Sequence, residues 1–255
     1  MRVAAFMSGT GTNIRKLIEH EKKLQKIEGI SPFEVVFIFS DRADGTCQGE
    51  AIAREYGLPY FSYDIRSFYK KRSLVRTVRT REGMEARKEF DQIPKKLIAA
   101  FGTDINVLGG YMSYTTIKRC VNIHPADLSI FTPEGRRKYI GDNAVLDAIA
   151  AGEQYLHAST IWTDEGIDTG PLLMVSQPIE VVLPEDLDAL LSNRSRLLEV
   201  VKMYQKRLKE TGDWKILPLT VEMIARGEFA LDNKGQVYVD GKPVLKGYRP
   251  DFSSS

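Results

Sequence analysis

Short, wholly apolar runs alternate along this chain with longer segments of helical periodicity. The first runs are residues 3–7 (VAAFM) and 35–39 (VVFIF), and between them apolar side chains from Ile14 to Leu24 recur at near-helical spacing. Such runs are typical of parallel strands that are buried on both faces and joined by crossover helices. The chain therefore opens with a predicted βαβ unit.

The same alternation continues through the middle of the chain. Further strands are expected at residues 59–63, 105–109 and 120–124, and further helices at 47–57, 66–100 and 144–151. We expect Pro94 to break the long basic helix, because proline lacks the amide hydrogen that a helix interior requires. A short helix is expected between the last two of these strands.

The last third of the chain changes character. Residues 158–163 and 172–182 alternate in polarity, which predicts an antiparallel hairpin added to a parallel sheet. Pro184 is expected to begin one long helix, which Gly212 closes. The apolar face of this helix is predicted to consist of Leu187, Leu190, Leu191, Leu197, Leu198, Val201, Tyr204 and Leu208.

These elements predict an α/β fold of the doubly wound, Rossmann-like kind, with a mostly parallel mixed sheet and helices on both faces. We expect a single domain over residues 1–255. Its last part, residues 230–255, is expected to be a closing hairpin and a polar tail, because Asp-Gly at 240–241 between alternating runs is a strong turn signal.

The composition excludes several classes of protein. Lysine plus arginine is 36 against 34 for aspartate plus glutamate, so the chain has no global field for nucleic acid. Residues 66–96 are locally basic, and such a run is more often a solvated helical face than a nucleic-acid site. No apolar run approaches the roughly 18 residues that cross a bilayer. Only Cys47 and Cys120 are present, which indicates a reducing cytoplasm.

The loop of residues 8–13 (SGTGTN) joins the first strand to the first helix. Its two glycines allow a tight turn, and the amide groups at a helix start form an anion site. Ile14 stands where the third glycine of a dinucleotide fingerprint would fall, and no P-loop lysine follows. We expect a monophosphate here, against the plainer interpretation that the glycines serve helix–strand packing.

A second candidate site lies at the end of a buried strand, where Asn122 and His124 are two residues apart and point to the same side. An amide that donates to a carbonyl oxygen beside an imidazole is a pair suited to acyl transfer. Asp168, in a polar turn further on, is an acid that could orient the imidazole. A structural histidine and a simple hairpin turn are the plainer alternatives. Of the other histidines, His157 is a weaker candidate than His124, and His20 is expected on a surface helix.

Taken together, these motifs resemble the folate-dependent formyltransferases nearly from end to end, and among them the enzymes of purine synthesis. The matching segments are residues 8–13, 109–112 (GGYM), 122–125 (NIHP), 166–171 (GIDTGP) and 237–248. Motifs in the right order at compatible spacing are far more specific than any one motif alone.

The resemblance implies transfer of a formyl group from N10 of 10-formyltetrahydrofolate, the co-substrate, to the amine of glycinamide ribonucleotide, without a metal. Asn122 would hold the formyl oxygen as it becomes an oxyanion, His124 would stabilise that charge or assist proton transfer, and Asp168 would keep His124 charged and oriented. The binding residues that it implies are Gly11, Thr12 and Asn13 for the substrate phosphate, and Met112, Ser113, Tyr114, Asp164 and Glu165 for the folate.

The chain departs from the family at several positions. Thr12 stands where serine is usual, Ser113 replaces a position that is often basic or bulky, and Ile161 stands where the purine enzymes commonly have histidine. The loop 126–142 differs from the usual Ser-Leu-Leu-Pro stretch, and residues 67–86 are an extra, basic helical insertion.

These departures leave alternatives open. One is a relative that formylates another amine, such as a nucleotide sugar, or that hydrolyses the formyl-folate. Another is a folate- or nucleotide-binding protein without activity, and the last is a nicotinamide-dependent oxidoreductase that uses Asp41 as its ribose acid. We expect a small phosphorylated amine as substrate, neither membrane nor nucleic acid as partner, and a homodimer as one state to test. The insertion could also hold an anionic group, such as the polyglutamate tail of a folate.

Overall fold

The computed structural model describes residues 1–252, so the predicted tail at 253–255 lies outside the described residues. The chain divides into two compact units, Met1–Asn122 and Ile123–Ser255. In the described part of the chain, no helix is both long enough and apolar enough to cross a membrane.

The strands of the first unit are all parallel and follow the order β3-β2-β1-β4-β5. They are β1 (Arg2–Met7), β2 (Glu34–Ser40), β3 (Tyr60–Ser62), β4 (Ile105–Leu108) and β5 (Cys120–His124). Each corresponds to a predicted strand. The apolar runs of β1, β2, β4 and β5 are buried, as expected for strands covered on both faces, whereas β3 is only partly buried. Because β1 lies between β2 and β4, the order of the strands reverses there, and ligands of such sheets bind beside that point.

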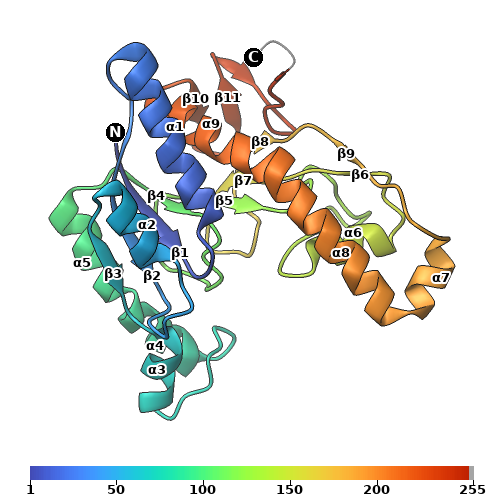
Figure 1. Ribbon diagram of the computed structural model, residues 1–255, viewed down its shortest axis with the longest axis horizontal. Helices are drawn as coiled ribbons and strands as arrows, with labels where there is room; N and C mark the ends of the chain where they lie inside the picture. The colour runs from blue at the N-terminus through green and yellow to red at the C-terminus, as the bar shows by residue number, and fades with distance from the viewer. Residues whose placement is uncertain (253–255) are drawn as a thin grey trace. The chain divides into compact units, whose positions relative to one another are not determined.

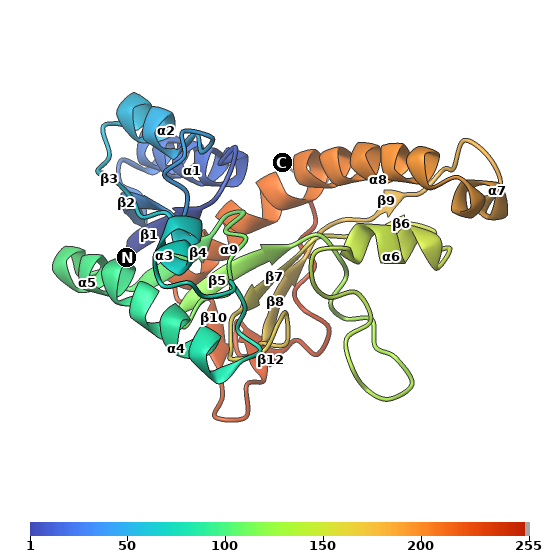
Figure 2. The same cartoon turned by 90° about the horizontal axis from the view of Figure 1, so that it is seen from below.

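Helices cover both faces of this sheet (Figure 2). They are α1 (Thr12–Glu28), α2 (Gly49–Tyr56), α3 (Ile65–Lys71), α4 (Arg81–Phe90) and α5 (Gln92–Phe101). Figure 2 shows α1 and α2 on one side of the strands and α4 and α5 on the other. On the second side, Phe6 and Phe37 from the strands pack with Phe68, Phe90 and Phe101 from the helices.

Two expectations for the first unit are wrong. Pro94 does not break a helix, because it is the third residue of α5, where the amide group has no partner within the helix in any case. The interruptions fall instead at residues 72–80 and at Asp91. The short helix expected between β4 and β5 is absent from residues 109–119, where Thr116 donates its backbone amide to the Asp91 carboxylate at 2.7 Å.

Asp91 also forms an ion pair with Arg87 of α4. The two side chains are 0% and 1% exposed, and the guanidinium donates in addition to the Tyr111 hydroxyl at 3.1 Å. A buried pair of charges needs such further hydrogen bonds to offset its desolvation. The end of α4 is therefore fixed to the segment that follows β4.

The second unit contains the predicted hairpin, in which β7 (Ser159–Trp162) pairs antiparallel with β8 (Leu172–Val175). The expected strand 172–182 is in fact two strands, because β9 (Ile179–Glu180) pairs with β6 (Tyr155–Leu156) instead. The closing hairpin of β11 (Val237–Val239) and β12 (Lys242–Pro243) is confirmed, and Phe229–Leu231 adds β10 as a third strand. Its turn residues, Asp240 and Gly241, have φ of 49° and 75°, the backbone that an Asp-Gly turn supplies.

The single long helix predicted from Pro184 is wrong. It is divided at Asn193 into α7 (Leu187–Ser192) and α8 (Arg194–Leu208), and the Asn193 side chain caps α8. Figure 1 shows α8 alongside α6 (Ala144–Ala150), a helix that was expected. Leu191 and Leu198 are 44% and 47% exposed, so the buried stripe is narrower than the sequence suggests.

Gly212 does not end a helix either, because the chain continues through the π-helical turn η1 (Lys209–Asp213) into α9 (Trp214–Ala225). A Cβ at Gly212 would lie 3.1 Å from that of Ala158. Close packing therefore favours glycine here, and packing is not visible in a local sequence pattern.

Candidate functional site

The loop of residues 8–13, called the phosphate loop below, runs from the end of β1 into the first turn of α1. Gly11 has a φ of 66°, and a Cβ there would lie 2.3 Å from the Met7 methyl group, so only glycine fits. Among residues 1–252, no side chain caps the amide groups of α1, and its first turn has no acidic residue. A helix start of this kind is suited to an anion, and Thr12 and Asn13 lie within it.

The segment of residues 109–114 is predicted to contact the folate and is called the folate segment below. It follows β4 and touches the phosphate loop. The Met112 amide donates to the Ser8 hydroxyl at 3.0 Å, and the Ser8 amide donates to the Gly110 carbonyl at 3.1 Å. The Ser113 hydroxyl donates to the carboxylate of Asp41, while the Met112 side chain is 67% exposed. The structure therefore brings together two segments to which the family resemblance assigns different ligands.

At the end of β5, His124 contacts Asp168. The imidazole Nδ1 lies 3.3 Å from Oδ2 of the carboxylate, and the two side chains are 6% and 10% exposed. The same carboxylate oxygen accepts the Gly141 amide at 2.9 Å. Asn122 is half-buried two residues before His124 on the same strand. The sequence left open whether this histidine and this acid meet, and they do.

Both ring nitrogens of His124 face acceptors. Nε2 lies 2.9 Å from the Tyr139 carbonyl, which can only accept, so Nε2 carries a hydrogen. Nδ1 then carries a second hydrogen, facing Asp168, only when the ring is charged. Burial lowers the pKa of His124, and the Asp168 carboxylate and the Tyr139 carbonyl act in the opposite direction.

This lowered pKa predicts a pH dependence of stability. Unfolded histidine titrates at about 6.5, so below that pH the unfolded chain takes up the proton before the folded chain does. The contribution of neutral His124 to the free energy of unfolding is therefore complete above pH 6.5 and is lost as the pH falls toward the lowered pKa. We expect denaturant unfolding of the wild type to lose more stability below pH 6.5 than unfolding of His124→Gln. Equal pH slopes in the two proteins would contradict this.

The loop of residues 129–143 holds the Asp168 turn in place. Asp168 has a φ of 55°, an unusual value for a residue with a side chain. The Arg137 guanidinium donates to the carbonyl of Asp168, and to that of Gly170 at 2.7 Å. Burial of this guanidinium lowers the pKa of Arg137. Together with the Tyr139 carbonyl and the Gly141 amide, this loop contacts both His124 and Asp168.

Sequence reasoning missed the three residues of this loop that make those contacts. Two of the contacts, those of Tyr139 and Gly141, are made by backbone groups, which leave no signature in residue type. One sequence signal could have pointed to these residues: the segment after His124 departs from the pattern of the family that the chain resembles.

Removal of the Arg137 side chain should loosen the Asp168 turn. We expect Arg137→Ala to lower kcat of the reaction proposed below by about tenfold to a hundredfold, because a displacement of about 1 Å at a reacting centre can cost a hundredfold. Steady-state kinetics would show the loss, and Arg136→Ala, at a neighbouring exposed arginine, is the matched control. If kcat of Arg137→Ala equals that of the control, the bonds from Arg137 to the Asp168 turn do not contribute to turnover.

The predicted folate residues Asp164 and Glu165 lie in the turn between β7 and β8. Asp164 accepts from the Gly166 amide at 2.9 Å and from the Thr169 hydroxyl at 2.7 Å, so it stabilises the turn itself. A Cβ at Gly170 would lie 1.9 Å from the Trp162 carbonyl oxygen, which explains that glycine.

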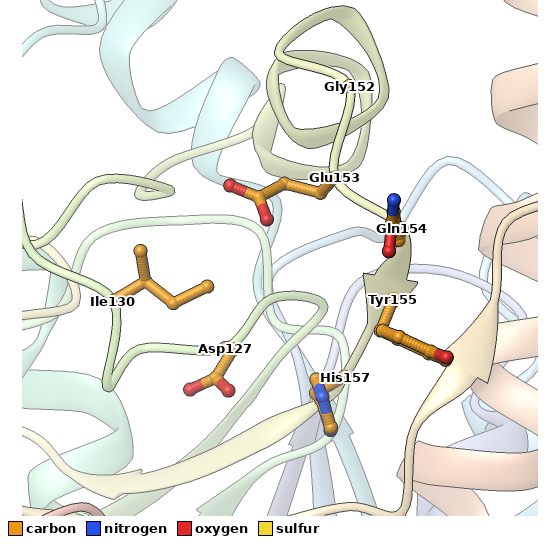
Figure 3. Close-up of a pocket in the computed structure, with 7 residues that line it drawn as sticks. All are labelled: Asp127, Ile130, Gly152, Glu153, Gln154, Tyr155 and His157. Carbon is orange, nitrogen blue, oxygen red and sulfur yellow. The ribbon is translucent and has the colours of Figure 1, made fainter.

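A polar cavity of about 430 Å³ lies elsewhere in the second unit. Figure 3 shows its lining residues, which are Asp127, Ile130, Gly152, Glu153, Gln154, Tyr155 and His157. Its charged groups already have partners, because Asp127 pairs with Arg249 at 2.7 Å and Glu153 pairs with Lys138 at 3.0 Å. His157, the weaker candidate, donates from Nδ1 to the Ser176 carbonyl at 2.8 Å. Within residues 1–252, no group of three His, Cys, Asp or Glu side chains is arranged to hold a metal ion.

Comparison with known proteins identifies relatives along the whole chain. A family model described as Formyl transferase matches residues 1–208. Phosphoribosylglycinamide formyltransferase of Haemophilus influenzae is 26% identical over 256 residues, covering 97% of this chain and 98% of the relative. The protein of the same name from Mycobacterium tuberculosis is 28% identical over 214 residues, covering 81% of this chain and 80% of the relative.

Solved structures show the same fold. The phosphoribosylglycinamide formyltransferase of Coxiella burnetii superposes with a TM-score of 0.66 at 23% identity, covering 98% of this chain and 99% of the other. That of Anaplasma phagocytophilum gives a TM-score of 0.65 at 20% identity, with the same coverage. The predicted fold class, a mostly parallel mixed sheet with helices, is confirmed.

Proposed function

Because this chain belongs to the formyl transferase family, we propose that it transfers the formyl group of 10-formyltetrahydrofolate to the amine of glycinamide ribonucleotide, a step of de novo purine synthesis. The observation that carries the proposal is the buried contact between His124 and Asp168 at the end of β5. The nearly full-length alignment with a relative named as a phosphoribosylglycinamide formyltransferase supports the choice of acceptor.

In the proposed reaction, the acceptor amine attacks the formyl carbon. The new C–N bond forms, the bond from the formyl carbon to N10 breaks, and a proton of the amine passes to N10 of the departing tetrahydrofolate. The Asn122 amide would donate to the formyl oxygen as it becomes an oxyanion. His124 would stabilise that charge or carry the proton, and Asp168 would hold and orient the charged ring.

The two ring nitrogens of His124 have separate tasks in this scheme. A proton taken up at Nδ1 is stabilised at once by Asp168, which lies 3.3 Å away. Nε2 is bonded to the Tyr139 carbonyl at 2.9 Å, so this carbonyl has to give way before Nε2 can bond to a substrate atom.

The binding roles proposed for the remaining residues follow their positions. The amide groups of Gly11, Thr12 and Asn13 would hold the substrate phosphate at the start of α1. The folate would be bound by the folate segment, with Met112, Ser113 and Tyr114, and by backbone groups of the turn that carries Asp164 and Glu165.

We further propose that residues 1–255 act as one formyltransferase domain in the cytoplasm, with no metal. A homodimer is the oligomeric state to test, by light scattering. The basic insertion at 67–86 includes most of α3 and the start of α4, and its exposed cations suit an anionic group.

The alternatives are separated by one assay. Purified protein would be mixed with 10-formyltetrahydrofolate and each candidate acceptor, and release of tetrahydrofolate would be followed. Release that depends on glycinamide ribonucleotide supports the proposal, whereas release without any acceptor indicates a hydrolase. Release only with another amine, such as a nucleotide sugar, changes the acceptor, and folate binding without release indicates a binding protein. The oxidoreductase alternative is disfavoured because Asp41 is 1% exposed and bonded to two serines.

The oxyanion role of Asn122 predicts a loss in kcat. We expect Asn122→Ala to lower kcat by about a hundredfold to a thousandfold, the usual cost of one such donor, with little change in KM. Steady-state kinetics with both substrates would measure this. A loss confined to KM would assign Asn122 to substrate binding instead.

A further inference from the structure

We infer that Asp41 is a positioning residue that joins the phosphate loop to the folate segment, so that binding of either substrate strengthens binding of the other. This inference rests on the proposed function, because it takes the two segments to bind the ribonucleotide and the folate.

Asp41 directly follows β2, and it is 1% exposed. One carboxylate oxygen accepts the Ser8 hydroxyl at 2.6 Å, and the other accepts the Ser113 hydroxyl. A buried carboxylate is costly unless its oxygens are hydrogen-bonded, so these two serines stabilise the charge. Because one serine belongs to the phosphate loop and the other to the folate segment, a single side chain connects them.

Ser8 completes the connection. Its hydroxyl donates to Asp41 and accepts the Met112 amide at 3.0 Å, so its hydrogen is committed to the carboxylate. The Met112 amide of the folate segment thus donates to Ser8, and Ser8 in turn donates to Asp41. Both serines act here as donors, so each needs an acceptor atom, and the amide of asparagine offers only one.

This arrangement couples the two segments energetically. A ligand that orders one segment also orders the other through the shared carboxylate, so the second ligand has less conformational entropy to lose. Coupling of this kind is reciprocal and typically amounts to about fivefold or more in affinity. A carboxylate with a purely structural role would affect folding stability without affecting this ratio.

The test measures binding without chemistry. Tetrahydrofolate, which has no formyl group to transfer, is titrated by calorimetry into the full-length protein in the absence and in the presence of saturating glycinamide ribonucleotide. We expect the ribonucleotide to tighten tetrahydrofolate binding about fivefold or more in the wild type. In Asp41→Asn the factor by which the ribonucleotide tightens tetrahydrofolate binding should fall close to one.

Two further variants make the result specific. Asp44→Asn removes an exposed carboxylate three residues along the same loop, and it should keep the wild-type factor. Ser113→Ala leaves the buried Asp41 in place and removes only its link to the folate segment, so its factor should also fall. This variant keeps the test decisive if Asp41→Asn does not fold.

The outcomes separate the inference from the proposed function. If the wild type binds both ligands without coupling, or if Asp41→Asn and Ser113→Ala keep the wild-type factor, the inference is wrong and the proposed function stands. If the wild type binds neither ligand, both are wrong.

Discussion

Substitution of His124 by alanine is expected to lower kcat by about a hundredfold to ten-thousandfold, the usual contribution of a positioned group that transfers protons. The structural reason is that the ring is held from both sides, by Asp168 at Nδ1 and by the Tyr139 carbonyl at Nε2. The ring is therefore held in one orientation, with Nδ1 facing the carboxylate that would stabilise a proton taken up there. Single-turnover measurements with saturating folate and ribonucleotide would isolate the chemical step.

His157→Ala is the matched control for this experiment. His157 is a histidine of the same unit whose ring also bonds to a backbone carbonyl, in this case through Nδ1, but it lines the polar cavity instead of contacting Asp168. We expect its kcat to stay near that of the wild type. If His124→Ala folds and keeps near wild-type turnover, the assignment of His124 is wrong.

Substitution of Asp168 by asparagine is expected to lower kcat by a similar factor, about a hundredfold to ten-thousandfold. An amide keeps the size of the side chain but cannot stabilise a charged imidazole, and it can hold the ring in an unproductive tautomer. The Gly141 amide, which donates to this carboxylate at 2.9 Å, would still find an acceptor if the amide oxygen faced it. The fold should therefore survive the change.

The pH profile distinguishes a catalytic Asp168 from a structural one. If Asp168 acts through the charge of His124, the variant should lose activity and also shift the pH dependence of kcat toward lower pH, because the imidazolium has lost its counter-charge. An unshifted profile combined with a reduced melting temperature would show that Asp168 serves only to hold its turn.

The sequence predicted the structure correctly where the local backbone or the burial of a single strand restricts which residues can occur. The apolar runs of β1, β2, β4 and β5 are buried on both faces, as their continuous apolar pattern predicted. Gly11 of the phosphate loop and the Asp-Gly turn at 240–241 were equally readable, because backbone with positive φ restricts residue type.

Expectations failed where a distant contact decided the local structure. The segment after β4 is not helical because Thr116 bonds to Asp91, a residue 25 positions earlier. Gly212 lies inside a helical stretch because Ala158 packs against it. Neither partner can be recognised from residues nearby in the sequence. The same holds for the loop that contacts His124 and Asp168, since two of its contacts come from backbone groups.

The buried Arg87–Asp91 pair has a consequence for how variants of this enzyme are interpreted. Loss of one partner would leave an uncompensated charge inside the protein, at a cost of about 3–5 kcal/mol. A typical domain has only about 5–15 kcal/mol in total. Because Asp91 also bonds to Thr116, such a loss would disturb the chain just beyond the folate segment. A screen that counts product alone would then report Arg87 as essential to the chemistry, although the defect is one of folding.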